Sequence, residues 1–263
     1  MKKLIDYKIE LVYTVLIVAL TIYFAYSTHV PNPNYLMSGF LGGLLIVTWF
    51  IRAFALYSGR KISQYSEVIQ RISIKERFFA YLILPMMLYI SLLLYVYFNT
   101  SFVMDVVLTV ISGLLLFILF LNVKSSFSKV YTIARQTRAV FDFICISSFY
   151  LLISVIIRLG TSIWLSILII AVVSLILFWS DIKVHRKESM TAFLISIVSC
   201  LFVAMISGGF FNTNIFVVPA VGTLAFYLVL SIWNIRFAGK TKFVDYLLPF
   251  LYSILALILI LKI

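Results

Sequence analysis

The chain alternates between long apolar runs and short polar segments. Each run is about 20 residues long, which is the length that an α-helix needs to cross the hydrocarbon core of a bilayer. Runs such as LLLFILFL at 114–121 show no alternation of apolar and polar residues, so they do not fit the strands of a membrane barrel. Because backbone groups in hydrocarbon must be paired within their own segment, each run is predicted to be a helix.

The pattern predicts an all-α protein, a polytopic bundle of about nine transmembrane helices in a single membrane domain over residues 1–263. The first apolar run is expected to be retained, because no small-residue cleavage site follows Ser27. Hydrophobic residues make up 64% of the chain and charged residues 11%, which excludes a soluble globular protein. The predicted spans are 11–27, 36–57, 78–98, 102–122, 139–157, 162–179, 190–207, 215–233 and 244–261.

Basic residues gather in alternate loops. All but two of the 21 Lys and Arg residues fall before the first predicted helix or around every second loop; the exceptions are Arg158 and Lys262. Cytoplasmic loops retain Lys and Arg, so the N-terminus is expected inside and the C-terminus outside. We expect an integral protein of a plasma membrane, with anionic inner-leaflet lipids as partners. The short outer loops favour a prokaryotic membrane. The basic loops are too short to build a nucleic-acid-binding surface.

Similar sequences end several of the runs. WFIR at 49–52 and WNIR at 233–236 close two of them, which predicts either a repeated helical hairpin or a shared solution to the membrane interface. Indole rings favour the boundary between acyl chains and headgroups. The predicted interfacial anchors are Trp49, Trp164, Trp179 and Trp233. The basic residues expected to contact lipid headgroups are Arg52, Lys124, Lys183 and Arg236.

One basic loop has a helical pattern of its own. Residues 61–76 place Ile62, Tyr65, Ile69 and Ile72 at helical spacing with charges between them. This pattern predicts an amphipathic helix lying in the membrane interface or covering the inner ends of the bundle.

Charged residues inside membrane spans are the usual sign of a transport or catalytic site. Here every acidic residue lies in a loop or within about a turn of a predicted helix end. Asp142 and Asp245 follow Arg138 and Lys242 by three or four positions. These four residues form a candidate polar site at the cytoplasmic face that could hold a metal or a headgroup. The alternative is a set of local ion pairs or helix-dipole contacts.

Other residues carry structural expectations. Asp105 and Arg158 lie at predicted outer helix ends and are expected to form an ion pair, whereas His29 is expected to face solvent. Gly39 and Gly43 form a G-x-x-x-G pair that favours close approach of another helix. No spacing typical of a metal site or of a nucleotide-binding or nucleophile motif occurs, so no metal and no cofactor is expected.

Three classes of function fit this sequence. The first is an uncoupled carrier of a lipid-like or apolar solute, or the membrane subunit of a transport or assembly complex. The second is an intramembrane enzyme that acts on lipid headgroups at the cytoplasmic interface through the candidate polar site. The third is a non-catalytic membrane scaffold, alone as a homo-oligomer or with a partner membrane protein. The lack of charge at mid-depth favours the carrier or subunit, and the sequence names no catalytic residue.

Overall fold

A computed structural model describes residues 7–30, 35–57, 59–61, 69–71, 79–128, 135–184, 189–240 and 242–262. Within these residues, nine helices are long and apolar enough to cross a membrane, which confirms the predicted helical bundle. The long helices are α2 (Lys8–His29), α3 (Tyr35–Tyr57), α5 (Leu84–Phe98), α6 (Phe102–Ser128), α7 (Arg135–Arg158), α8 (Ile163–Val184), α9 (Ser189–Gly209), α10 (Val217–Phe237) and α11 (Phe243–Ile260). The chain is a multi-pass membrane protein by the length and composition of these helices.

The loop after α3 differs from its prediction. Strand β1 (Gly59–Lys61) pairs with β2 (Ile69–Arg71) in an antiparallel ribbon, so the predicted amphipathic helix over 61–76 is wrong at residues 69–71. The sequence around β2, VIQRISI at 68–74, is rich in β-branched residues, which lose side-chain freedom in a helix and suit strands. Residues 62–68 and 72–76 of the predicted helix lie outside the described part.

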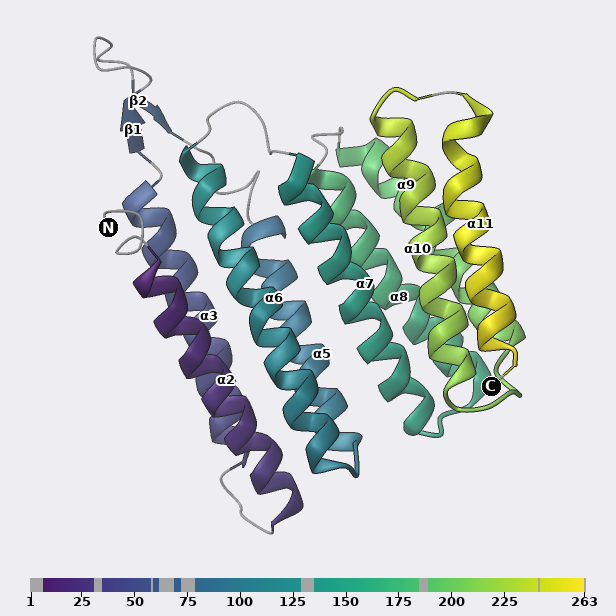
Figure 1. Cartoon of the computed structure of the whole chain (residues 1–263), viewed down its shortest axis with the longest axis horizontal. Helices are drawn as coiled ribbons and strands as arrows, with labels where there is room; N and C mark the ends of the chain where they lie inside the picture. The colour runs from purple at the N-terminus through teal and green to yellow at the C-terminus, as the bar shows by residue number, and fades with distance from the viewer. Residues whose placement is uncertain are drawn as a thin grey trace. The chain divides into compact units, whose positions relative to one another are not determined.

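The chain divides into two compact units, Met1–Ile144 and Cys145–Ile263, with the boundary inside α7. In the first unit, α2 lies alongside both α3 and α6, and α5 lies next to α6 (Figure 1). The core of this unit contains stacked aromatic rings: Trp49 of α3 and Phe120 of α6 have ring centroids 4.0 Å apart.

A short π-helix, η1 (Phe79–Ile83), leads directly into α5. Pro85 lies in the first turn of α5 and has no N–H to donate to the preceding turn. The wider turn of η1 is the local solution, since π-turns accommodate a break in the regular helical hydrogen bonds. The proline therefore marks the start of α5 and does not interrupt it.

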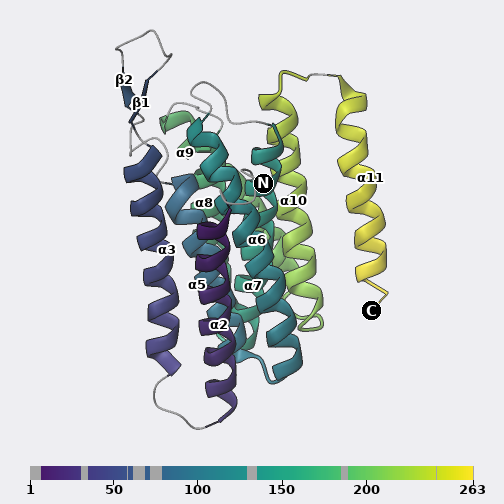
Figure 2. The same ribbon diagram turned by 60° about the vertical axis from the view of Figure 1, so that its left-hand side comes forward.

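The second unit is built around a different aromatic stack. Phe226 of α10 lies between Phe149 of α7 and Phe178 of α8, with ring centroids 4.5 Å and 4.2 Å away. Helix α11 packs beside α10 and stands apart from α8 and α9 (Figure 2). Its buried residues are Pro249 and Ser253, and its other faces expose large apolar side chains, as expected for a helix in contact with lipid.

Candidate functional site

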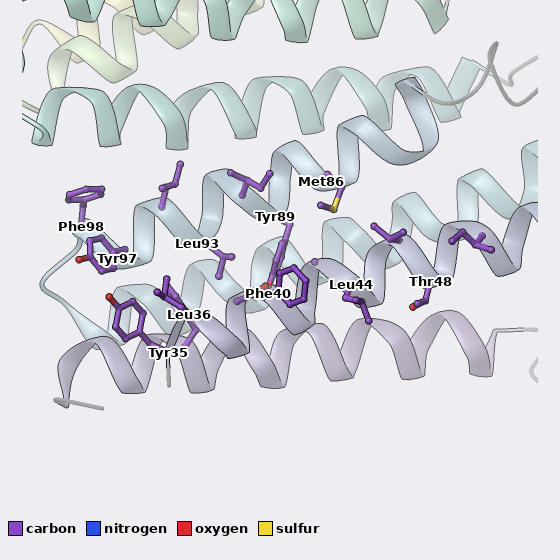
Figure 3. A pocket seen from close by; sticks show the side chains of 17 residues that line it. Tyr35, Leu36, Phe40, Leu44, Thr48, Met86, Tyr89, Leu93, Tyr97 and Phe98 are labelled. Carbon is purple, nitrogen blue, oxygen red and sulfur yellow. The ribbon is translucent and has the colours of Figure 1, made fainter. Parts of the chain in front are cut away.

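An open groove of about 900 Å³ runs between α3 and α5 in the first unit (Figure 3). Its 17 lining side chains come from these two helices and from Phe24 of α2. The α3 residues recur every three or four positions from Tyr35 to Ile51, so they form one stripe along the helix. At about 1.5 Å per residue this stripe is about 24 Å long, which is most of the roughly 30 Å thickness of the hydrocarbon core.

The floor of the groove depends on small residues of α3. The Tyr89 ring of α5 lies against Gly42, and its hydroxyl donates a hydrogen bond of 2.9 Å to the Gly39 carbonyl oxygen. A Cβ atom at Gly42 would come within 2.7 Å of Tyr89 Cζ. A Cβ at Gly43 would only reach ordinary contact, 3.7 Å from Met86 Cε. The predicted small-residue stripe therefore faces α5, and a tyrosine ring occupies the space that the glycines leave.

The walls of the groove are apolar and open on one side. Leu36, Phe40 and Ile51 are 68%, 70% and 59% exposed, although each has an apolar side chain. Exposed apolar surface of this extent on a membrane helix is in contact with lipid tails. The open side of the groove is therefore expected to face the membrane.

Few polar atoms line the groove. The Thr48 hydroxyl donates to the Leu45 carbonyl oxygen at 2.9 Å, and the Tyr89 hydroxyl is bonded to Gly39. The two remaining hydroxyls belong to Tyr35 and Tyr97, whose rings are stacked with centroids 6.0 Å apart. None of the described lining residues is charged.

The residues of the predicted cytoplasmic polar site divide between the two units. Arg138 and Asp142 lie on α7 in the first unit, and Lys242 and Asp245 lie at the start of α11 in the second. The Asp245 carboxylate is 3.8 Å from Lys240 Nζ, whereas its backbone N–H donates to the Lys242 carbonyl oxygen. That these four residues form one polar site stays a prediction. Among the described residues, no three His, Cys, Asp or Glu side chains are grouped to hold a metal.

One residue predicted to contact headgroups has a partner within the protein. Lys124 of α6 lies 3.1 Å from the Glu10 carboxylate of α2, and the two side chains are 15% and 4% exposed. The ammonium group is held by a buried carboxylate because an unpaired charge there would be costly. Lys183 has its Nζ 4.5 Å from the centre of the Trp179 ring, a cation–π contact. Arg52 and Arg236 are exposed, and their headgroup contacts stay predictions.

The four tryptophans have different environments. Trp49 is 1% exposed, and its ring is enclosed by protein and stacked on Phe120, so its predicted role as an interfacial anchor finds no support in its burial. Trp233 donates its indole N–H to Ser199 Oγ at 3.0 Å, a partner within the protein where a headgroup was expected. Trp164 is 80% exposed at the start of α8, and its contact with the interface, like that of Trp179, stays a prediction.

A second buried carboxylate lies at the other end of α2. Asp105 of α6 is fully buried, and its oxygens lie 3.1 Å from His29 Nε2 and 2.7 Å from Asn99 Nδ2. His29 therefore contacts a carboxylate, contrary to the expectation that it faces only solvent. The ion pair between Asp105 and Arg158 stays a prediction. Neither Glu10 nor His29 was a predicted site residue, because nothing in their local sequence identifies a partner on α6.

The groove was also missed at the sequence level. Its one local signal is the stripe of small and aromatic residues on α3 from Tyr35 to Gly43. Comparison of the chain with protein-family models, curated proteins and solved structures finds no match. The function is therefore inferred from the geometry of the groove.

Proposed function

We propose that the protein binds a lipid-like molecule in the groove between α3 and α5 and acts as an uncoupled carrier for it. The observation behind the proposal is the groove itself, an apolar space of about 900 Å³ that is open to the side. Its volume is in the range of small-molecule sites, and its length suits an extended hydrocarbon chain. The exposed side chains of Leu36 and Phe40 would cover one flank of such a chain.

The position of charged groups supports carriage without ion coupling. In the described helices, each Asp and Glu lies within about two turns of a helix end, and the groove is lined by uncharged side chains. Proton and sodium coupling generally use ionisable groups placed deep in the membrane. The energy for movement would then come from the concentration gradient of the lipid.

A second candidate is the membrane subunit of a larger complex, and one observation favours it. The α11 span has 11% of its residues buried, against 33% or more in each of the other described spans. A partner membrane protein could cover its exposed residues, which include Phe243 and Val244. Native mass spectrometry of the purified protein would then show a second polypeptide that is lost on removal of α11.

Binding in the groove can be tested by photolabelling. The probe is hexadecanol with a diazirine at the far end of its chain, added to the protein in phosphatidylcholine vesicles, with labelled peptides identified by mass spectrometry. We expect labelling concentrated on α3 and α5. Leu44→Trp should reduce it about tenfold, because the larger ring fills the groove and the loss of contact costs about 1.4 kcal/mol.

The matched control is Leu168→Trp, since Leu168 is also an exposed leucine but lies on α8 in the second unit. This variant should label like the wild type. Even labelling of all lipid-facing helices, or labelling of α3 and α5 that survives Leu44→Trp, would contradict the proposal.

Carriage needs a separate measurement. An uncharged glucosyl lipid with a fluorescent NBD group on its chain is placed in both leaflets of vesicles, and dithionite is added outside. With the protein present, dithionite should reduce the probe in both leaflets, because inner-leaflet probe is carried to the outer leaflet. Leu44→Trp should slow the loss of the inner-leaflet fluorescence to the same extent as it reduces photolabelling. Loss of the outer-leaflet signal alone in protein-containing vesicles would leave binding intact and refute carriage.

A further inference from the structure

We infer that the groove selects uncharged single-chain lipids with a hydroxyl or ester head, and that the head lies at the end formed by Tyr35 and Tyr97. This inference rests on the proposed function and adds the class of ligand and its direction. It comes from the polar atoms of the groove, which are few and unevenly placed.

The first step concerns the hydroxyls that are free to bind. Thr48 and Tyr89 already donate their single O–H groups to backbone carbonyls, so neither has a donor left for a ligand. Neither the Tyr35 nor the Tyr97 hydroxyl has a hydrogen-bond partner among the described residues. A phenolic hydroxyl can both donate and accept a hydrogen bond. The groove therefore has one end that can satisfy a polar head.

The second step concerns depth. Tyr35 is the first residue of α3 and Tyr97 is the last but one of α5, so both lie where these helices end. Figure 3 shows the two rings side by side at one end of the groove, with Met86 and Thr48 toward the other. Tyrosine favours this level of a bilayer because its ring is apolar and its hydroxyl can meet water or headgroups. A ligand with its head at these two hydroxyls would extend its chain toward Met86.

The third step concerns charge. No described lining residue carries a charge that could neutralise an ionic head. Asp105 is the first ionisable residue after the groove residue Phe98 in the chain. Its carboxylate is buried and is bound by Asn99 and His29. Among the described lining residues, an anionic head would find no cation and a cationic head would find no carboxylate. A charged head therefore gains no ion pair at this end, whereas a hydroxyl or ester can form a hydrogen bond with a tyrosine hydroxyl.

Competition experiments test this selectivity. Four 16-carbon competitors share the same chain and differ in the head: hexadecanol, methyl hexadecanoate, hexadecanoate at pH 8 and hexadecyltrimethylammonium. Each is titrated against photolabelling of α3 and α5 by the diazirine hexadecanol. We expect the alcohol and the ester to compete at concentrations about fivefold lower than the two charged molecules, the effect of one hydrogen bond on a binding constant.

The variant Tyr35→Phe with Tyr97→Phe removes both hydroxyls and keeps both rings. It should still be labelled on α3 and α5, but the preference for uncharged heads should fall below about twofold. The control is Tyr252→Phe, because Tyr252 is 57% exposed on α11, away from the groove residues in the chain. This control should keep the full preference.

The outcomes separate this inference from the proposed function. If Leu44→Trp reduces labelling as expected but all four competitors act equally, the groove binds lipid and the inference about the head is wrong. An unchanged preference in the double Phe variant would also overturn it, because the tyrosine hydroxyls would then have no part in recognition. If Leu44→Trp has no effect on labelling, the proposed function itself is wrong.

Discussion

Buried acidic side chains near both ends of α2 join this helix to α6. Glu10 meets Lys124 at one end, and His29 meets Asp105 at the other. A buried ion pair adds little net stability compared with apolar packing, but the loss of one partner leaves an uncompensated charge. The two pairs lie 19 residues apart on α2, so we expect them to fix the register between the helices.

Removal of one member of the Glu10–Lys124 pair should destabilise the protein strongly. Lys124→Met leaves a carboxylate that is 4% exposed, so we expect a loss of about 3 to 5 kcal/mol in the free energy of unfolding. The double variant Glu10→Met with Lys124→Met should recover most of this loss, because no charge is then left buried. Reversible unfolding in mixed detergent micelles would measure all three variants.

The second unit supplies a matched control for this cycle. Lys240 and Asp245 form a pair at 3.8 Å, but their side chains are 50% and 29% exposed. Lys240→Met should therefore change the stability by less than about 1 kcal/mol, since exposed pairs contribute little. Equal losses in Lys124→Met and Lys240→Met would show that burial of the first pair has no energetic consequence.

These partnerships could not be predicted from the sequence. Glu10 and Lys124 are 114 positions apart, and a lysine at a helix end is more often directed to headgroups. Trp49 followed the interface pattern in the same way, yet its ring is buried against Phe120. At this scale the sequence identifies the kind of residue at a helix end, but the neighbouring helix decides which contact it makes.

The approach of α3 to α5 gives a prediction at the scale of elements. Gly42→Ala should cost about 1 to 3 kcal/mol, because the new methyl group overlaps the Tyr89 ring and its hydrogen bond to Gly39. Gly43→Ala should be neutral or should stabilise the helix by up to about 1 kcal/mol, because its methyl group has room and alanine favours helix. Thermal unfolding of the two variants in detergent would compare them directly.

A compensating change makes the cause specific. The Tyr89 hydroxyl is the group nearest to the added methyl group, so Tyr89→Phe should restore part of the stability in the Gly42→Ala background. The same change in the wild type should be destabilising by about 1 kcal/mol, because a hydrogen bond is lost. If Tyr89→Phe is equally harmful in both backgrounds, overlap with the hydroxyl is not the cause.

Secondary structure was predictable only where the bilayer dictates it. The nine spans follow from the length of the apolar runs, because backbone pairing in hydrocarbon leaves no other solution. The strand at Ile69–Arg71 was not predicted, since apolar residues at helical spacing outweighed the β-branched composition in the sequence analysis. The groove was missed for a different reason: it is a space between two helices and exists only once Tyr89 of α5 is placed over the glycines of α3.

At the scale of the whole molecule, the distribution of charge predicts an orientation. All but two of the 21 basic residues belong to alternate loops, and each basic side chain is costly to move across the hydrocarbon core. The odd number of described spans would place the two ends of the chain on opposite sides. By the positive-inside rule, we expect the side that carries Arg236 and Lys240 to be the cytoplasmic one.

Two cysteine variants at the opposite ends of α10 test this orientation. Asn212 precedes the helix and Ala238 follows it, and both residues are exposed. The native Cys145 and Cys200 are buried and are replaced by alanine in the background. In intact cells, a membrane-impermeant maleimide should label Asn212→Cys within minutes and Ala238→Cys only after permeabilisation, because Arg236 and Lys240 hold that end inside. Labelling of Ala238→Cys alone in intact cells would show that the chain is inserted the other way, and it would move the Tyr35 end of the groove to the cytoplasmic leaflet.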